Sequence, residues 1–386
     1  MMCHSSSKIR VTMIGTLPPM KGISRYCYFL ASAISDLVDL EFISFKKLYP
    51  DFLYPGGTDK EQTSEKLTIK FKREDNLHGW NPVTWIKSAL QCSGNIVHLQ
   101  WWSIVLFPAC FVLLILSKIR CKRIVVTIHN VIPHEHAKIG KILTRILINF
   151  SDAIIVHSNS NKEVLIKKYP NVKEDYVFVV PHGLLSFDEK IYDTNTAKAL
   201  LGIPSNLKTV LFFGNIRPYK GLKYLIKAMS KVTRILPSTR LIIAGHSWED
   251  WREYEQLIEK ENMIDKVIIK REYINSKEAQ ILFAATDLVV LPYEEFDAQS
   301  GVGLMALNYC KPMLVTSVGG LPELVQDPIS VVEPKNSEML ADKIVFILRD
   351  VELLSKLEKD AIRNREKYQW SKIANLTLQI YARLLN

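Results

Sequence analysis

A turn rich in cations follows an apolar stretch near the middle of the chain. Residues 210–213 have the pattern of a buried strand that ends at Gly214, and Arg217, Lys220 and Gly221 come before an amphipathic helical pattern. The start of a helix offers free backbone N–H groups and the positive end of the helix dipole, and both favour anions. Ligands of open α/β sheets bind beyond the carboxyl ends of the strands. The segment therefore predicts a site for the phosphates of a nucleotide at Gly214, Arg217 and Lys220, the alternative being a solvated surface turn.

A second turn joins the first predicted strand to the first predicted helix. It runs from Gly15 through Pro18 and Pro19 to Lys21 and Gly22. Because glycine has no side chain, Gly22 would let backbone N–H groups approach a phosphate of a donor or an acceptor closely. A tight turn with a purely structural role is the alternative.

Apolar strand patterns alternate with helical patterns along the 386 residues. Strands are predicted at 11–15, 40–45, 96–100, 124–128, 153–157 and 177–180, and again at 210–213, 241–244, 267–269, 288–291, 313–316 and 330–332. This alternation is typical of parallel sheets covered by helices on both faces. The polar stretch 186–196 separates the two halves. We therefore expect an α/β protein of two doubly wound, Rossmann-like domains with a cleft between them.

The charge balance indicates an anionic partner. Fifty Lys and Arg residues against forty Asp and Glu residues give a formal charge of +10. A nucleotide, a nucleic acid or an anionic membrane surface would each fit this charge. The basic residues are scattered and no nucleic-acid recognition motif is present, so we expect no nucleic-acid partner.

The cysteines and the N-terminus indicate a cytoplasmic protein. The six cysteines form no Cys-x-x-Cys pair, and several lie in apolar runs, which predicts reduced core residues without zinc or disulfides. Residues 1–10 lead into the first strand without the apolar region of a secretory signal.

Residues 104–116 form the most apolar segment of the chain. Lys118, Arg120, Lys122 and Arg123 follow it. About thirteen residues are too few for a membrane span, which needs roughly twenty. Two interpretations remain, a buried helix of the sheet layer or a helix that dips into the inner leaflet with a basic collar. The second would place the protein peripherally on the inner face of the plasma membrane.

Motifs in a fixed order carry a resemblance to a known family. They are GTLPPMKGISRYCYFLA (15–31), TIHNVIPHE (127–135), VHSN (156–159), VVPHG (179–183), FFGNIRPYKG (212–221), LIIAG (241–245), DLVVLPY (287–293), QSGVGLMAL (299–307) and VTSVGGLPELV (315–325). The chain resembles the retaining glycosyltransferases of family 4, which have the GT-B fold and build bacterial and archaeal surface polysaccharides.

The resemblance implies an architecture and two substrates. It implies an acceptor-side domain at 1–185, a nucleotide-sugar-binding domain at 200–365, and a final helical segment at 366–386 that crosses back to the first domain. The donor would be a nucleoside-diphosphate sugar. The acceptor would be a saccharide or a polyprenyl-linked saccharide at the membrane.

The resemblance also assigns site residues. His129, which ends the strand 124–128, would lie beside the donor sugar; a hydrogen-bonded core histidine is the alternative. The family often has two Glu residues separated by seven others, and alignment on Lys311 and Pro312 places Asp297 and Met305 there instead. A thioether cannot accept the hydrogen bonds that a ribose diol offers a carboxylate.

The QSGV run (299–302) resembles a subgroup of the family in which Gln-Ser-Gly replaces the usual Glu-containing sequence. Ser300 is predicted to cap a helix whose N-terminus, with Gln299, Gly301 and Val302, would face the diphosphate. Asp297 or Gln299 could hold the sugar hydroxyls.

Glu323 is the last site residue that we single out. It is predicted on a helix that Pro322 begins, where either pairing with the helix dipole or a ligand contact would explain it.

Neither a metal ion nor another cofactor is expected. The chain contains no Asp-x-Asp, and His134, Glu135 and His136 are adjacent on a loop, which gives poor geometry for a metal site. Arg217, Lys220 and a helix dipole would then offset the charge of the leaving diphosphate.

Together with these features, the resemblance implies a metal-independent transferase that retains the anomeric configuration. Catalysis would fall to His129, Asp297, Arg217 and Lys220. The alternatives are a catalytically weakened GT-B scaffold or non-catalytic membrane-associated subunit, which Met305 makes conceivable, an epimerase of the same fold, and a nucleic-acid binder.

Overall fold

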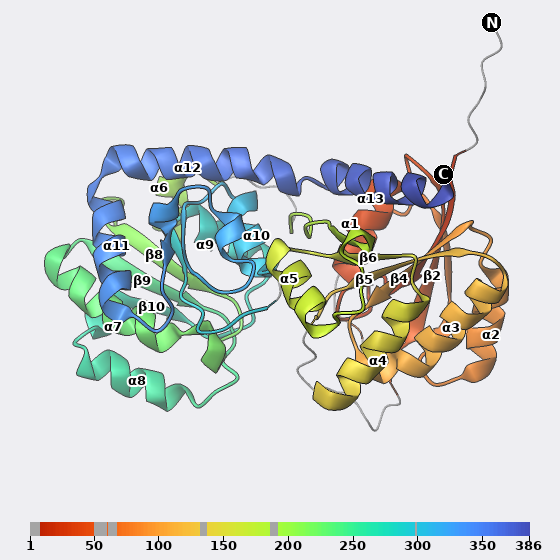
Figure 1. Cartoon of the computed structure of the whole chain (residues 1–386). Helices are drawn as coiled ribbons and strands as arrows, with labels where there is room; N and C mark the ends of the chain where they lie inside the picture. The colour runs from red at the N-terminus through yellow and green to blue at the C-terminus, as the bar shows by residue number, and fades with distance from the viewer. Residues whose placement is uncertain (1–7, 50–59, 61–67, 132–136, 186–191, 298) are drawn as a thin grey trace, which may run out of the picture. The chain divides into compact units, whose positions relative to one another are not determined.

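The chain folds into two compact units. The computed structural model describes residues 8–49, 60, 68–131, 137–185, 192–297 and 299–386. Unit 1 consists of residues 1–183 together with 369–386, and unit 2 of residues 184–368 (Figure 1). Each unit is a parallel sheet with helices on both faces, so the predicted α/β class with two Rossmann-like domains is confirmed.

Unit 1 contains a seven-stranded parallel sheet in the order β3-β2-β1-β4-β5-β6-β7. The strands are β1 (Arg10–Gly15), β2 (Asp39–Lys47), β3 (Lys72–His78), β4 (Ile96–Trp101), β5 (Arg123–Ile128), β6 (Ala153–Val156) and β7 (Val177–Val179). The strand order reverses between β1 and β4. Loops at the carboxyl ends of the strands beside such a reversal are the usual place for ligands.

Helices cover both faces of this sheet. On one face lie α2 (Pro82–Gln91), α3 (Phe107–Ile119), which follows the short η2 (Ile104–Leu106), α4 (Ala137–Phe150) and α5 (Asn159–Lys168). On the other face lie α1 (Ser24–Ile34) and the last helix, α13 (Trp370–Leu385). A short η3 (Glu174–Tyr176) precedes β7. The segment 369–386 is part of unit 1 because α13 buries Ile373, Ala374, Ile380 and Tyr381 in the core beside α1.

Unit 2 contains a six-stranded parallel sheet in the order β10-β9-β8-β11-β12-β13. The strands are β8 (Lys208–Phe213), β9 (Thr239–Ala244), β10 (Val267–Lys270), β11 (Leu288–Leu291), β12 (Met313–Thr316) and β13 (Val331–Val332). One core cluster lies beneath α7 (Leu222–Ile235), α8 (Trp251–Lys260) and α11 (Ser337–Arg349). A second lies beneath α9 (Ser276–Ala284) and α10 (Gly301–Asn308).

The remaining elements of unit 2 are α6 (Thr194–Leu200), α12 (Val351–Arg365) and five short helical turns. The turns are η4 (Pro218–Lys220), η5 (Ile264–Lys266), η6 (Pro322–Leu324), η7 (Pro328–Ser330) and η8 (Glu366–Tyr368).

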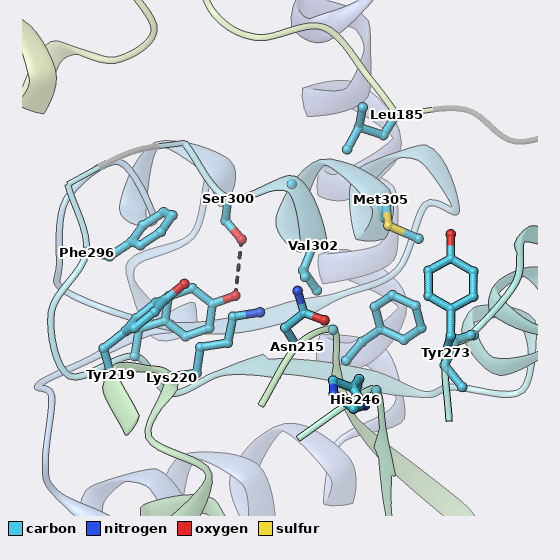
Figure 2. A pocket seen from close by; sticks show the side chains of 16 residues that line it. Leu185, Asn215, Tyr219, Lys220, His246, Tyr273, Phe296, Ser300, Val302 and Met305 are labelled. Carbon is cyan, nitrogen blue, oxygen red and sulfur yellow. Dashed lines mark hydrogen bonds between the residues drawn. The ribbon is translucent and has the colours of Figure 1, made fainter. Parts of the chain in front are cut away.

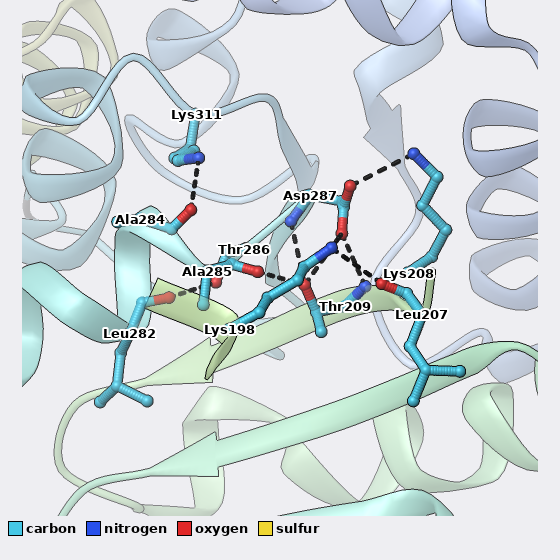
Figure 3. Close-up of polar contacts among 10 residues, drawn as sticks. All are labelled: Lys198, Leu207, Lys208, Thr209, Leu282, Ala284, Ala285, Thr286, Asp287 and Lys311. Atoms are coloured by element: carbon cyan, nitrogen blue, oxygen red, sulfur yellow. Dashed lines mark hydrogen bonds and ion pairs between the residues drawn. The ribbon is translucent and has the colours of Figure 1, made fainter. Parts of the chain in front are cut away.

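A largely buried carboxylate, 12 % exposed, connects α6 to the sheet of unit 2 (Figure 3). Asp287, just before β11, accepts hydrogen bonds from Lys198 Nζ at 3.0 Å, from the backbone N–H of Thr209 at 2.9 Å and from the Thr209 hydroxyl at 2.9 Å, and Lys208 Nζ lies 3.3 Å away. Burial acts to raise the pKa of Asp287, but the nearby Lys198 charge and these hydrogen bonds lower it. The network lies at the amino ends of β8 and β11, so it stabilises the sheet at the edge opposite the loops that follow the strands.

One strand was not predicted, one predicted helix needs correction, and part of the predicted linker is not tested. Strand β3 was not predicted, because its sequence KREDNLH is charged; it pairs with β2 at the edge of the sheet and buries only Leu77. The predicted helix at Pro322 is only the three-residue turn η6. Residues 186–191 of the predicted linker lie outside the described residues.

The apolar segment 104–116 forms η2 and most of α3. The helix packs between α2 and α4 and buries Ala109, Cys110, Leu113 and Leu114, so these residues follow the buried interpretation. Within the residues described, no helix is long and apolar enough to cross a membrane.

Candidate functional site

A cavity of about 390 Å³ lies within unit 2, where the loops leave the carboxyl ends of its strands (Figure 2). This volume is in the range of small-molecule sites. Aromatic and aliphatic side chains dominate the lining, and none of the described lining residues carries a carboxylate. The lining residues are Leu185, Phe213, Gly214, Asn215, Tyr219, Lys220, Gly245, His246, Tyr273, Ile274, Tyr293, Phe296, Ser300, Gly301, Val302 and Met305.

Lys220 is the charged side chain of this lining. It ends the turn η4, and only 7 % of its surface is exposed. Its Nζ lies 5.6 Å from the centre of the Tyr293 ring. Burial, and then repulsion from Arg217, lowers the pKa of Lys220 to about 8. An ammonium group that is poorly solvated and has a cation as neighbour favours an anionic ligand.

Two glycines explain why this ammonium can reach the cavity. Gly214 follows β8 with φ +91°, and a Cβ there would lie 3.1 Å from Lys220 Nζ. Gly221 follows Lys220 with φ +68°, and a Cβ there would collide with the carbonyl oxygen of Pro292. Both conformations suit glycine. The predicted Gly214 and Lys220 are therefore placed together in the cavity.

The N-terminus of α10 forms a second part of the lining. The hydroxyl of Ser300 accepts a hydrogen bond from the backbone N–H of Gly303 at 3.2 Å, so the predicted N-cap is confirmed. The Tyr293 hydroxyl lies 3.3 Å from the same oxygen, as the dashed line in Figure 2 shows. Gly301 and Val302 begin the helix and also line the cavity. This end of the cavity therefore combines Lys220 with the positive end of a helix.

Arg217 is not part of the lining. Its guanidinium lies over the ring of Trp248, 4.6 Å from the ring centre, which is a cation–π contact. It nevertheless contributes positive potential, because it lowers the pKa of Lys220.

The other end of the cavity is apolar. Met305 is 6 % exposed and lies one helical turn beyond Gly301. Figure 2 shows it on the side of Tyr273, away from Lys220. The cavity is thus cationic at one end and apolar at the other.

Asp297, Gln299 and Glu323 do not line this cavity. The backbone of Asp297 approaches the loop at Gly319, where a Cβ would lie 3.3 Å from its nitrogen. The carbonyl oxygen of Glu323 accepts a hydrogen bond from the Tyr368 hydroxyl at 3.0 Å. Ligand contacts for these three residues stay predictions.

In unit 1, three histidines follow three neighbouring strands. His129 follows β5, His157 follows β6 and His182 lies three residues after β7. Tyr26 of α1 contacts all three rings, with ring centres 4.8 to 5.2 Å apart. Sequence reasoning singled out only His129, although a histidine just beyond each of three strand ends was a readable signal.

Hydrogen bonds connect these rings to the sheet. His157 Nε2 lies 3.1 Å from His129 Nδ1, and His157 Nδ1 lies 3.0 Å from the carbonyl oxygen of Val180. His129 Nε2 lies 2.9 Å from Gln100 Oε1. In β4, His98 lies 2.6 Å from the Tyr381 hydroxyl of α13 and 2.7 Å from the Thr127 hydroxyl. His129 is therefore both the predicted strand-end residue and a member of a hydrogen-bonded core network.

Proton counting constrains this network. A carbonyl oxygen only accepts, so His129 Nε2 and His157 Nδ1 must each donate, and a hydrogen bond between the two rings needs a third proton. The pair then carries one positive charge. Burial opposes that charge: it lowers the pKa of His157 to about 4 and, with the neighbouring histidines, lowers the pKa of His129 well below its usual value. A neutral pair is satisfied if Gln100 instead presents its NH₂ group to His129.

Gly15 and Gly22, the two glycines of unit 1 predicted to lie near a phosphate, have different surroundings. Gly15 is buried, and a Cβ there would lie 3.1 Å from both Cys27 Sγ and Gln100 Cγ, so close packing explains this glycine. Gly22 has φ +92° and lies in the loop before α1, near Trp102. A phosphate contact for either residue stays a prediction.

The residues described contain no group of three or more His, Cys, Asp or Glu side chains placed to hold a metal ion. His134, Glu135 and His136 lie outside them.

Comparison with known proteins agrees with this architecture. A model described as Glycosyltransferase Family 4 matches residues 20–184, and a model described as Glycosyl transferases group 1 matches residues 193–364. The chain carries two glycosyltransferase domains. The first corresponds to most of unit 1 and the second to most of unit 2.

Curated relatives share part of this glycosyltransferase sequence. An uncharacterized glycosyltransferase of Methanocaldococcus jannaschii is 31 % identical over 242 residues, which are 59 % of each chain. A D-inositol 3-phosphate glycosyltransferase of Corynebacterium glutamicum is 26 % identical over 64 % of this chain and 61 % of its own length. The chain thus spans about three fifths of these relatives.

Solved structures share the fold over nearly the whole chain. HepE of Anabaena, solved in complex with UDP, has a TM-score of 0.72 at 17 % identity and covers 97 % of this chain and 100 % of its own. A glycosyltransferase from Rickettsia africae has a TM-score of 0.72 at 18 % identity, with 98 % and 99 % covered. The predicted GT-B fold is confirmed.

Proposed function

We propose that this protein transfers a sugar from a nucleoside-diphosphate sugar to a saccharide acceptor, with retention of the anomeric configuration. The observation that carries this proposal is the cavity of unit 2, where a buried lysine and the start of α10 meet at one end. The family domains and the UDP complex of HepE support a nucleotide donor.

The polarity of the cavity gives the donor an orientation. The diphosphate would bind at Lys220 and the backbone N–H groups of Gly301 and Val302, and the nucleoside would extend toward Met305 and Tyr273. Arg217, stacked on Trp248, would add positive potential. These cations would stabilise the charge that grows on the leaving diphosphate.

Retention is proposed to occur on one face of the sugar. The bond from the anomeric carbon to the phosphate oxygen breaks, the bond to the acceptor oxygen forms, and the acceptor proton moves to the leaving phosphate. The described cavity lining has no carboxylate that could act as a nucleophile in a double displacement. We further propose that His129 and Asp297 orient the sugar, as the sequence predicts.

The acceptor is proposed to be a lipid-linked saccharide in the synthesis of a cell-surface polysaccharide or glycoconjugate, and the protein is proposed to act in the cytoplasm at the inner face of the membrane. A Salmonella typhimurium relative, 24 % identical over 51 % of this chain, is a lipopolysaccharide 1,2-N-acetylglucosaminetransferase. That name motivates the class of acceptor.

Incubation with a panel of sugar nucleotides and membrane lipid extract tests the proposal. We expect an acceptor product heavier by one sugar residue, detected by mass spectrometry, with the anomeric configuration assigned by NMR. Binding of UDP and GDP, measured by thermal shift, distinguishes a nucleotide-dependent transferase from the alternative functions. Binding without transfer would favour a weakened scaffold, and the absence of binding by any nucleotide would contradict the proposal.

A further inference from the structure

Three neighbouring helices of unit 1 have an unusual charge composition. Helices α2, α3 and α4 lie beside one another in the layer that covers one face of the sheet (Figure 1). None of their residues is Asp or Glu, whereas five are cationic: Lys87, Lys118, Lys138, Lys141 and Arg145. A solvated helix layer normally mixes both signs of charge.

The same helices expose large apolar side chains. Val83, Ile86 and Leu90 follow one another along α2 at helical spacing, Ile119 ends α3, and Ile139 and Ile142 lie on α4. Each is between 49 % and 72 % exposed. Single exposed apolar residues are ordinary, but a group on adjacent helices marks an interaction surface.

Several of the cations remain available on this surface. Among the described residues, no carboxylate forms an ion pair with Lys87, Lys138, Lys141 or Arg145. Lysine and arginine alternate with isoleucine along the exposed side of α4. The cations have long apolar stems, so their charged ends can lie at the level of lipid phosphates while isoleucine inserts more deeply.

The basic collar expected after residue 116 behaves differently. Lys118 pairs with Asp152 at 2.8 Å, and Arg120 donates to the carbonyl oxygens of Ala89 and Leu90. Lys122 has a lowered pKa because of its partial burial and then because of Arg120 and Arg10, which shows that positive charges crowd one another there.

The nearest carboxylates on the adjoining edge strand are paired. On β3, which contacts α2, Asp75 lies 2.7 Å from Arg73, and Glu74 lies 3.7 Å from Lys72, which also pairs with Glu41 at 2.6 Å. These pairs reduce the negative charge beside the surface.

We propose that Val83, Ile86, Leu90, Ile119, Ile139 and Ile142, together with Lys87, Lys138, Lys141 and Arg145, form a basic helix face that docks on an anionic lipid membrane. Charge complementarity selects this partner: apolar side chains insert, and each cation near an anionic surface strengthens binding about fivefold. The inference goes beyond sugar transfer and rests on the proposed function only for its purpose, since a lipid-linked acceptor is presented at such a surface.

Flotation of the whole protein with vesicles tests the basic helix face. One vesicle set contains phosphatidylcholine alone and the other contains about one third phosphatidylglycerol. We expect the wild type to float with the anionic set at least tenfold more than with the neutral set, and to be released by high salt. The double variants Ile86→Glu/Ile142→Glu and Lys138→Glu/Lys141→Glu should each lose at least fivefold of this binding.

Matched controls lie on unit 2. Ile264 is 64 % exposed and Lys227 is exposed on α7, so Ile264→Glu and Lys227→Glu change the same residue types elsewhere and should float like the wild type. Val83→Glu, at a position 72 % exposed, replaces the Ile86 variant if that one does not fold. UDP binding, measured by thermal shift, should be the same in the wild type and in all variants. If the wild type itself does not bind UDP, this would contradict the transferase proposal and not the membrane inference.

The absence of flotation with anionic vesicles, or equal flotation by the face variants, would overturn the inference. A concentration-dependent dimer that the Ile86→Glu/Ile142→Glu change dissociates, without vesicle binding, would also overturn it and would make the face a contact between copies of the chain.

Discussion

The cavity of unit 2 holds a buried lysine without a carboxylate among the described residues of its lining. With a pKa of about 8, Lys220 is mostly protonated at neutral pH and loses its charge as the pH rises above 8. A bound diphosphate would favour the charged form. Affinity for a nucleoside diphosphate should therefore weaken as the pH rises above 8, because the Lys220 ammonium group loses its proton.

Replacement of Lys220 tests its role directly. Lys220→Ala should lower transfer several hundred-fold, because removal of one preorganised group that stabilises developing charge costs about 3 to 4 kcal/mol. Lys227→Ala, on the exposed side of α7, is the matched control and should retain wild-type rates. Initial rates of sugar transfer provide the measurement. Activity of Lys220→Ala within a factor of two of the wild type would contradict the diphosphate site.

The position of Met305 leads to a prediction about how the ribose of the nucleotide is recognised. One turn of α10, about 6 Å, separates it from Gly301 at the cationic end. A ribose attached to the diphosphate would therefore meet a thioether. We expect UDP and 2′-deoxy-UDP to bind the wild type within about threefold of each other in calorimetry.

The variant Met305→Glu should then prefer UDP by at least tenfold, since hydrogen bonds to a charged group contribute about 1.5 to 3 kcal/mol. Met305→Gln is the uncharged comparison and should show a smaller preference. A tenfold preference for UDP in the wild type would mean that another group binds the ribose hydroxyls.

The sequence indicated the residues of unit 2 better than those of unit 1. Gly214, Lys220, Ser300, Gly301 and Val302 were predicted together because they belong to two short contiguous segments. The histidine group of unit 1 was missed apart from His129, because its members come from separate strands and meet only when β5, β6 and β7 align in parallel.

At the scale of elements, the apolar sequence patterns predicted every strand of the described residues except β3. The missed strand shows the limit of that signal, because an edge strand buries little and its sequence is free to be charged. Helix α3 shows another limit. Its apolar sequence fits a core helix and an interfacial helix equally well, and only its packing between α2 and α4 separates the two.

Two buried histidines of unit 1, His98 within β4 and His157 just after β6, make the stability of this unit depend on pH. His98 and His157 are buried, and burial lowers their pKa values to about 3 and about 4. The unfolded chain binds protons near the ordinary pKa of 6.5, so stability is fully present above that pH and is lost as the pH falls toward 4. Each histidine should contribute roughly 1.4 kcal/mol per pH unit in this window.

Hydrogen exchange of peptides from β5 and β6 measures this effect. We expect protection to fall steeply between about pH 6 and 4 after correction for the intrinsic exchange rate. His157→Gln, which cannot titrate, should show a shallower dependence by about one proton. An identical slope in that variant would show that His157 is not responsible.

At the scale of the whole molecule, charge has two separate uses. The cations at the cavity of unit 2 are few and buried or stacked on aromatic rings, which suits recognition of one anionic ligand. Those of the basic helix face are exposed and alternate with apolar side chains, which suits an extended surface. The net charge of +10 is the sum of such local arrangements and by itself distinguishes neither.

The cations assigned to the cavity of unit 2 lead to a prediction about metal dependence. If Lys220, Arg217 and the start of α10 neutralise the leaving diphosphate, transfer needs no divalent ion. Transfer rates in EDTA should then remain within about twofold of those in Mg²⁺ or Mn²⁺. A metal-dependent glycosyltransferase assayed in the same buffers serves as the control, and it should lose its activity in EDTA. Because a chelator leaves the protein cations in place, loss of transfer in EDTA that Mn²⁺ restores would show that a bound metal, and not these cations alone, carries the charge of the leaving group.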